Sequence, residues 1–68
     1  MNIQSMGLDA DDEPLVVSPQ RAMRLLDVGH SKLYELISAG ELESYKEGKS
    51  RKITMRSIKG RIEQLLTA

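Results

Sequence analysis

Two short apolar stripes, separated by a gap of only three residues, constrain the fold of this chain most strongly. The first stripe follows Ser18-Pro19, a helix start in which serine caps free amides and proline suits the first turn. Ala22, Leu25 and Leu26 then stand at the i, i+3, i+4 spacing of one helix face. The pattern predicts a short amphipathic helix that ends at about Leu26.

A second stripe repeats this spacing directly after the gap. Leu33, Leu36 and Ile37 predict a helix over about residues 30–39, and Gly40 supplies the left-handed residue that commonly closes a helix. Two short helices joined by a three-residue connection form a helix-turn-helix arrangement. We expect the apolar faces of both helices to enter one core.

After the second helix the period of the sequence changes to two, which is typical of a strand. Alternation over residues 41–45 predicts one strand, residues 47–50 form a turn signal, and residues 51–54 predict a returning strand. Upstream, residues 15–17 are β-prone and predict a short edge strand. A small hairpin is not stable alone, so it has to pack against the helices.

A third helix is predicted over about residues 55–66, with Thr54 as its cap. Its apolar stripe has the i, i+4, i+7, i+8 spacing and consists of Ile58, Ile62, Leu65 and Leu66. We therefore expect an α+β fold in which three short helices, a two-stranded hairpin and a short N-terminal edge strand enclose one aliphatic core.

The composition excludes several classes of function. The chain has 68 residues, no cysteine and one histidine, so disulfides and thiolate metal sites are excluded, and we expect no metal or cofactor. The sequence has no phosphate-binding glycine loop and no nucleophile beside a general base, which favours a non-enzymatic protein. No apolar run reaches membrane-spanning length and the first residues lack signal-peptide character, so we expect a cytoplasmic protein with no membrane partner.

The zero net charge conceals a strong separation of charge along the chain. Residues 1–13 hold four acids and no base, whereas residues 14–68 hold six acids and all ten bases. We expect residues 1–13 to be a disordered acidic tail and residues 14–68 to be the folded domain. A basic domain behind an acidic tail suggests a polyanionic partner, although a solubilising tail on an ordinary domain explains the charges about equally well.

The ordered set of motifs resembles the excisionase-type, MerR-like winged helix-turn-helix family over residues 15–66. The resemblance lies in the SPxxAxxLL first helix, the VxxSxLYxLI second helix, the AGEL bend, the basic hairpin and the final helix. It implies a winged helix-turn-helix domain that binds double-stranded DNA. Three positions depart from the family pattern, which usually has glycine at Asp27, a serine or threonine cap at Gly29 and often a base at Glu35.

In such a fold, residues near the start of the second helix reach base edges in the major groove. Here those residues are His30, Ser31, Lys32, Tyr34 and Glu35. Lys32 can donate to guanine or to a phosphate. We favour an ion pair with Lys32 for Glu35, which otherwise accepts only from a base donor such as cytosine N4. His30 is more often a surface residue that meets a phosphate when protonated, and Tyr34 packs on the hairpin or offers its hydroxyl to a phosphate.

The hairpin concentrates positive charge, with four bases within seven residues. Lys46, Lys49, Arg51 and Lys52, with Ser50 between them, can follow a DNA backbone, and Arg51 is the first choice for insertion into a minor groove. The alternative is that the charges only discourage edge-to-edge pairing of strands. We favour DNA contact because a helix-turn-helix precedes the hairpin directly.

The start of the first helix offers a further phosphate site. Ser18 and the first-turn amides can bind one phosphate, and Gln20 and Arg21 lie close enough to add contacts. Arg56 and Lys59 on the third helix are weaker candidates for DNA contact, and we favour the interpretation that they form a solvated face. The prediction as a whole requires the bases of the second helix and the hairpin to share one face of the molecule.

The resemblance implies an excisionase that binds and bends an attachment site, promotes excision by an integrase and acts at the nucleoid. A small transcription regulator with the same DNA contacts is the alternative, because one fold serves both roles. A protein-interaction adaptor that binds no DNA is a third hypothesis. The free protein is expected to be monomeric, and neighbouring copies are expected to associate cooperatively on DNA through the hairpin.

Overall fold

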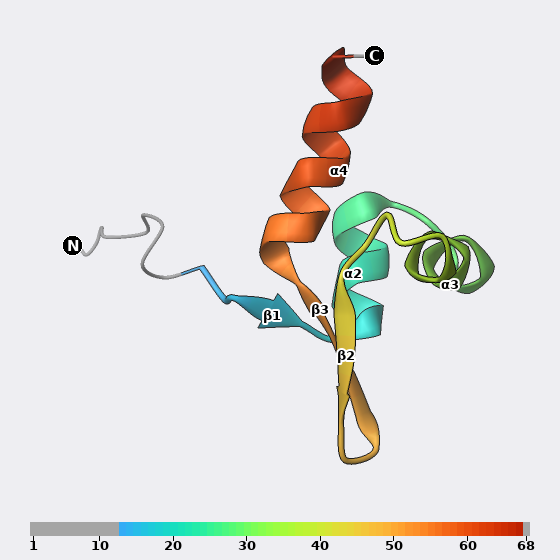
Figure 1. Cartoon of the computed structure of the whole chain (residues 1–68), viewed down its shortest axis with the longest axis vertical. Coiled ribbons are helices and arrows are strands. Elements are labelled where there is room, and N and C mark those ends of the chain that lie inside the picture. The colour runs from blue at the N-terminus through green and yellow to red at the C-terminus, as the bar shows by residue number, and fades with distance from the viewer. Residues whose placement is uncertain (1–12, 68) are drawn as a thin grey trace.

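A computed structural model describes residues 13–67 of the chain. Along this range the elements follow in the order β1 (Val16–Val17), α2 (Pro19–Leu26), α3 (His30–Ser38), β2 (Ser44–Glu47), β3 (Ser50–Thr54) and α4 (Met55–Thr67) (Figure 1). The predicted α+β class and the predicted order of elements are confirmed. We call the β2–β3 hairpin the wing.

The first helix begins and ends for local reasons that the sequence contains. Ser18 is extended, and its Oγ accepts a hydrogen bond from the amide of Arg21 at 3.2 Å, as a capping serine does. The helix ends at Leu26 because Asp27 adopts the left-handed conformation, with φ 56° and ψ 49°. Glycine takes that conformation without steric cost, which agrees with the glycine usual at this position in the family that the sequence resembles.

The sheet has three antiparallel strands in the order β1-β3-β2, so the wing is joined by the predicted edge strand. In the wing, Ser44 pairs with Ile53 and Glu47 pairs with Ser50, which leaves a two-residue turn at Gly48-Lys49. Gly48 has a φ of 63°, a value that favours glycine in a tight hairpin turn.

The predicted start of the first wing strand at residue 41 was wrong, because β2 begins only at Ser44. The amides of Glu41 and Leu42 both donate to the carbonyl of Leu36, at 2.9 and 3.3 Å, and so complete the end of α3. Leu42 then enters the core with 3% of its surface exposed. Residues 41 and 42 therefore close the second helix, and Glu43, whose carbonyl accepts a hydrogen bond from the Thr54 amide at 3.0 Å, leads into β2.

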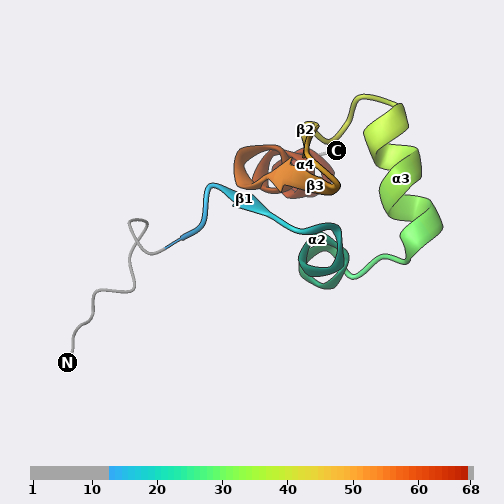
Figure 2. The same ribbon diagram turned by 90° about the horizontal axis from the view of Figure 1, so that it is seen from below.

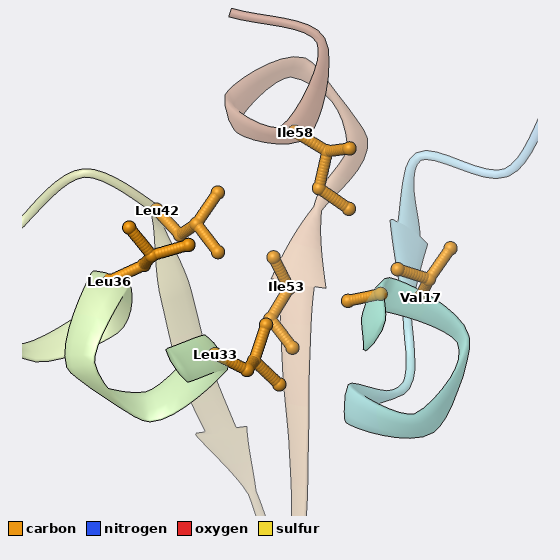
Figure 3. Packing of buried hydrophobic residues seen from close by; sticks show 7 residues of the cluster. Val17, Leu33, Leu36, Leu42, Ile53 and Ile58 are labelled. Atoms are coloured by element: carbon orange, nitrogen blue, oxygen red, sulfur yellow. The ribbon is translucent and has the colours of Figure 1, made fainter. Parts of the chain in front are cut away.

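The core is aliphatic, as expected for a chain without phenylalanine or tryptophan. Its buried members come from the helices, the sheet and the connection between α3 and β2, and they are Val17, Ala22, Leu33, Leu36, Leu42, Ile53 and Ile58 (Figure 3). Figure 2 shows α2 and α3 beside the sheet, with α4 seen nearly end-on behind β3. Each fully buried leucine or isoleucine contributes about 1.5–3 kcal/mol by leaving water.

The prediction that the whole α4 stripe lies in the core was wrong. Ile58 is 1% exposed, but Ile62, Leu65 and Leu66 are 40%, 58% and 79% exposed, because α4 extends past the small core (Figure 1). Leu25 of α2, also expected inside, is 43% exposed. Among the residues that the structure describes, no helix has the length and apolarity needed to cross a membrane.

Candidate nucleic-acid interface

An open groove of about 460 Å³ forms where the start of α2, the middle of α3 and the wing meet. Its lining comes from all three elements and consists of Ser18, Pro19, Gln20, Tyr34, Lys46, Lys49, Ser50, Arg51 and Lys52. We call this surface the basic groove. All of its residues except Pro19 are ones that the sequence singled out for DNA contact.

The register of the wing decides how its bases are arranged. Lys46 pairs with Arg51, and because Ile53 two residues further on is buried, both face the side of the helices. The Arg51 guanidinium donates to the Ser44 hydroxyl at 2.8 Å and is half-buried. Lys52 is the neighbour of Arg51 on β3, so it alternates to the other face, although it still borders the groove. The wing thus brings its bases to one groove from both faces of a narrow hairpin.

The second helix presents its polar residues outward. His30, Ser31, Lys32 and Glu35 are exposed on α3, while Tyr34 is half-buried where the helix borders the groove. The rings of His30 and Tyr34 lie with their centroids 4.6 Å apart and tilted by 31°. Tyr34 therefore connects the outer face of α3 with the basic groove.

The favoured ion pair on α3 is present. The Lys32 ammonium lies 3.4 Å from the Glu35 carboxylate, and both side chains are more than half exposed. An exposed i,i+3 pair contributes at most about 0.5 kcal/mol, so it does not prevent Lys32 from moving to another acceptor. Lys32 and Glu35 do not line the groove and lie instead on the adjoining face of α3. Arg21 is exposed on α2 and likewise lies outside the groove lining.

Acidic residues gather around α4, on elements away from the groove lining. Arg56 donates two hydrogen bonds to the Glu43 carboxylate, at 2.9 and 3.0 Å, and Thr54 donates a third. The hydrogen bonds from Arg56, and then that from Thr54, lower the pKa of Glu43, and the same pairing raises the pKa of Arg56. Glu43 thus remains ionised and compensates the charge of Arg56.

Two further bases of α4 are compensated in the same way. Lys59 lies 2.6 Å from a carboxylate oxygen of Glu13, and Arg61 pairs with Glu41. These contacts join residues that are 46 and 20 positions apart in sequence, so no local pattern could reveal them. Glu13 was predicted to end a disordered tail, but here it is held beside α4. The rest of that predicted tail, residues 1–12, lies outside the described residues.

The pairing around α4 leaves positive charge on the groove side. Within residues 13–67, no carboxylate lies in ion-pair distance of six bases, which are Arg21, Arg24, Lys46, Lys49, Arg51 and Lys52. Four of these six border the basic groove. Glu47 is the one acid of the wing strands, and it is exposed opposite Ser50. The surface is therefore suited to an anionic partner.

The chemical groups of the described residues bear on which ligands the groove can bind. Residues 13–67 contain no group of three or more histidine, cysteine, aspartate or glutamate side chains that could hold a metal ion. Apart from Pro19, the groove side chains are hydroxyls, an amide, a phenol and cations. Such groups recognise phosphate and base edges by hydrogen bonds and charge.

Comparison with known proteins agrees with this arrangement. A family model described as a helix-turn-helix domain matches residues 16–65. This range runs from β1 through most of α4 and includes every residue of the basic groove. Searches among curated proteins and among solved structures gave no significant match. The chain therefore belongs to the helix-turn-helix domain family of small DNA-binding proteins, which includes excisionase-type members.

Proposed function

We propose that this protein is an excisionase-type DNA-binding protein that seats a duplex in the basic groove, bends it and thereby assists an integrase in excision. One observation carries the proposal. The bases that border the groove have no carboxylate in ion-pair distance among the described residues, whereas the bases of α4 are all paired. Uncompensated cations in a concave surface attract phosphate, and release of counterions drives the binding.

The outer face of α3 is proposed to enter the major groove. His30, Ser31 and Lys32 stand at the first turn of the second helix, the part of a helix-turn-helix that reaches base edges. Lys32 can exchange its weak contact with Glu35 for a guanine acceptor or a phosphate. The Tyr34 hydroxyl is proposed to meet the phosphate between the major groove and the wing.

The wing is proposed to follow the adjoining minor groove. Arg51 was the first choice for insertion, but its guanidinium is half-buried and bonded to Ser44. Lys49 stands in the turn itself and is exposed. We therefore assign the minor-groove contact at the wing tip to Lys49. Arg51 and Lys46 are proposed to bind a DNA phosphate on the helix side of the wing. At the other end of the groove, Ser18 and Gln20 bind a phosphate at the start of α2.

Simultaneous contact of α3 with the major groove and of the wing with the minor groove is proposed to bend the duplex. A rigid domain that inserts one element in the major groove and another in the neighbouring minor groove pulls the duplex towards itself, at a deformation cost of a few kcal/mol that the added contacts offset. A bent attachment site brings separated integrase sites together. The partners of the proposal are thus double-stranded DNA and an integrase, acting at the nucleoid in the cytoplasm.

Salt titration of duplex binding tests the DNA contact. Five or six phosphate contacts predict a slope of log K against log salt of about −5. Absent or salt-independent binding contradicts the proposal and favours the adaptor. A footprint on DNA from around the gene then supplies the specific site.

Bending and excision separate the excisionase from the transcription regulator. The footprinted site, placed at different positions along a fragment, is predicted to migrate anomalously when the protein is bound, and the protein is predicted to stimulate excision by an integrase encoded nearby. Tight specific binding without bending or stimulation contradicts the excisionase role and favours a regulator.

A further inference from the structure

The second half of α4 carries an uncovered apolar surface. Ile62, Leu65 and Leu66 share one side of the helix and are 40%, 58% and 79% exposed. Among the described residues, this half of α4 extends beyond the other elements (Figure 1). We call these three residues the distal α4 face. Neighbouring large aliphatic side chains on one helix face are typical of a contact surface.

We propose that the distal α4 face is where two copies of this protein meet when both are bound to DNA. The inference rests on the proposed function, because it needs DNA to bring the copies together. Its occupant is the same face of a second copy, packed helix against helix.

The size of the face explains why DNA is needed. Burying the exposed parts of these three residues on both partners removes roughly 600 Å² from water, well below the roughly 1,200 Å² of a stable interface. The free protein is therefore expected to be monomeric at micromolar concentration. Two copies held on one duplex experience an effective concentration in the millimolar range, at which a weak contact becomes populated.

The rest of the molecule is compatible with this contact. The wing and α4 extend from the core in opposite directions, so the basic groove and the distal α4 face do not compete (Figure 1). The bases of α4 are compensated, since Arg56, Lys59 and Arg61 are each paired with a carboxylate. Two α4 helices can therefore approach without strong repulsion between those cations.

The symmetry of the contact determines the arrangement of the sites. When both copies use the same face, the pair has a twofold axis, so its two DNA sites must be inverted repeats. The sites must also lie on the same side of the duplex, which requires centres separated by about one helical turn or a multiple of it.

The test compares duplexes that carry one site, two inverted sites or two direct sites, built from the footprinted sequence at several spacings. Wild-type protein is expected to bind the second inverted site at least about fivefold more tightly than a single site. Leu65→Gln with Leu66→Gln is expected to abolish this gain and leave single-site affinity within twofold. Leu15→Gln is the matched control, because Leu15 is 86% exposed but lies before β1; it is expected to keep the gain.

A second measurement does not depend on those substitutions. The chain has no cysteine, so Glu63→Cys introduces a single thiol at the border of the distal α4 face, since Glu63 is exposed and stands three residues before Leu66. A short bismaleimide is expected to link two copies on the inverted-site duplex and not on the single-site duplex.

Several results overturn the inference. They are equal cooperativity in the Leu65→Gln, Leu66→Gln protein, no cooperativity at any inverted spacing, or no thiol linkage on two sites. A further one is a change in the amide signals of residues 62–66 in free protein when residues 1–12 are deleted, which identifies the chain's own first segment as the occupant. Loss of binding to the single site contradicts the proposed function instead, so the two failures are distinguishable.

Discussion

Replacing Lys46 and Lys49 by glutamine removes two uncompensated charges from the wing without touching the core, since both side chains are exposed. Each phosphate contact changes log K by about 0.9 for a tenfold change in salt. Loss of two contacts is therefore expected to reduce the salt slope from about −5 to about −3. At about 0.1 M salt, measured against a 1 M reference, this is a loss of roughly 60-fold in affinity, or about 2.5 kcal/mol.

Fluorescence anisotropy with a labelled duplex at several salt concentrations measures both quantities, and circular dichroism verifies that the variant is folded. Arg56→Gln with Lys59→Gln is the matched control. It removes the same charge from α4, where both bases are paired with carboxylates. Because charges beyond about 10 Å are largely screened at this salt concentration, the control is expected to keep the slope and to change affinity less than about threefold. Equal losses in the two variants would refute the reasoning, since net charge alone would then explain binding.

Three further predictions concern stability and the acidic segment. Asp27→Gly is expected to raise the free energy of unfolding by about 0.5–1 kcal/mol, because glycine adopts the left-handed conformation of Asp27 without strain; a lower urea midpoint contradicts this. Arg56 and Thr54 hold the pKa of Glu43 below its ordinary value, so its stabilising effect is complete above that value and is lost as the pH falls through the lowered one. Thermal midpoints of wild type and Glu43→Gln are thus expected to differ at neutral pH and to converge in acid, and a constant difference argues against the pairing. Deleting residues 1–12 removes three acids and is expected to tighten duplex binding a few-fold in anisotropy titrations, whereas weaker binding would make the segment a DNA contact.

Local chemistry made most of the fold predictable from sequence. Ser18 and Thr54 cap helices as expected, and the amide of Ser57 donates to the Thr54 hydroxyl at 3.3 Å. Both features depend on residues within one turn of each other. The apolar spacing located Leu33 and Leu36 in the core for the same reason, because the helical repeat alone determines which residues share a face.

The extent of the core was not predictable from spacing. The stripe of α4 continues to Leu66, but periodicity does not reveal where the neighbouring elements end. Ile58 meets the sheet and is buried, whereas Leu65 lies beyond it and is exposed. What appears from sequence as a longer core is in the structure an uncovered surface.

The candidate site was predictable in composition but not in arrangement. Sequence identified the wing bases, yet the direction of each side chain depends on the two-residue turn that pairs Lys46 with Arg51. A shift of one residue in that register would exchange the faces of Arg51 and Lys52. The pairing of Arg56 with Glu43 was also not predictable, because it joins the residue before β2 to α4, 13 positions further along the chain.

Titration of isotope-labelled protein with a duplex, followed through its backbone amide signals, tests most directly whether the basic groove is the DNA-binding surface. The expected result is a set of large, salt-sensitive shifts at the start of α2, on the first turns of α3 and at Gly48-Lys49, with the distal half of α4 unchanged on single-site DNA. Shifts centred on α4, with the wing unaffected, would contradict the account.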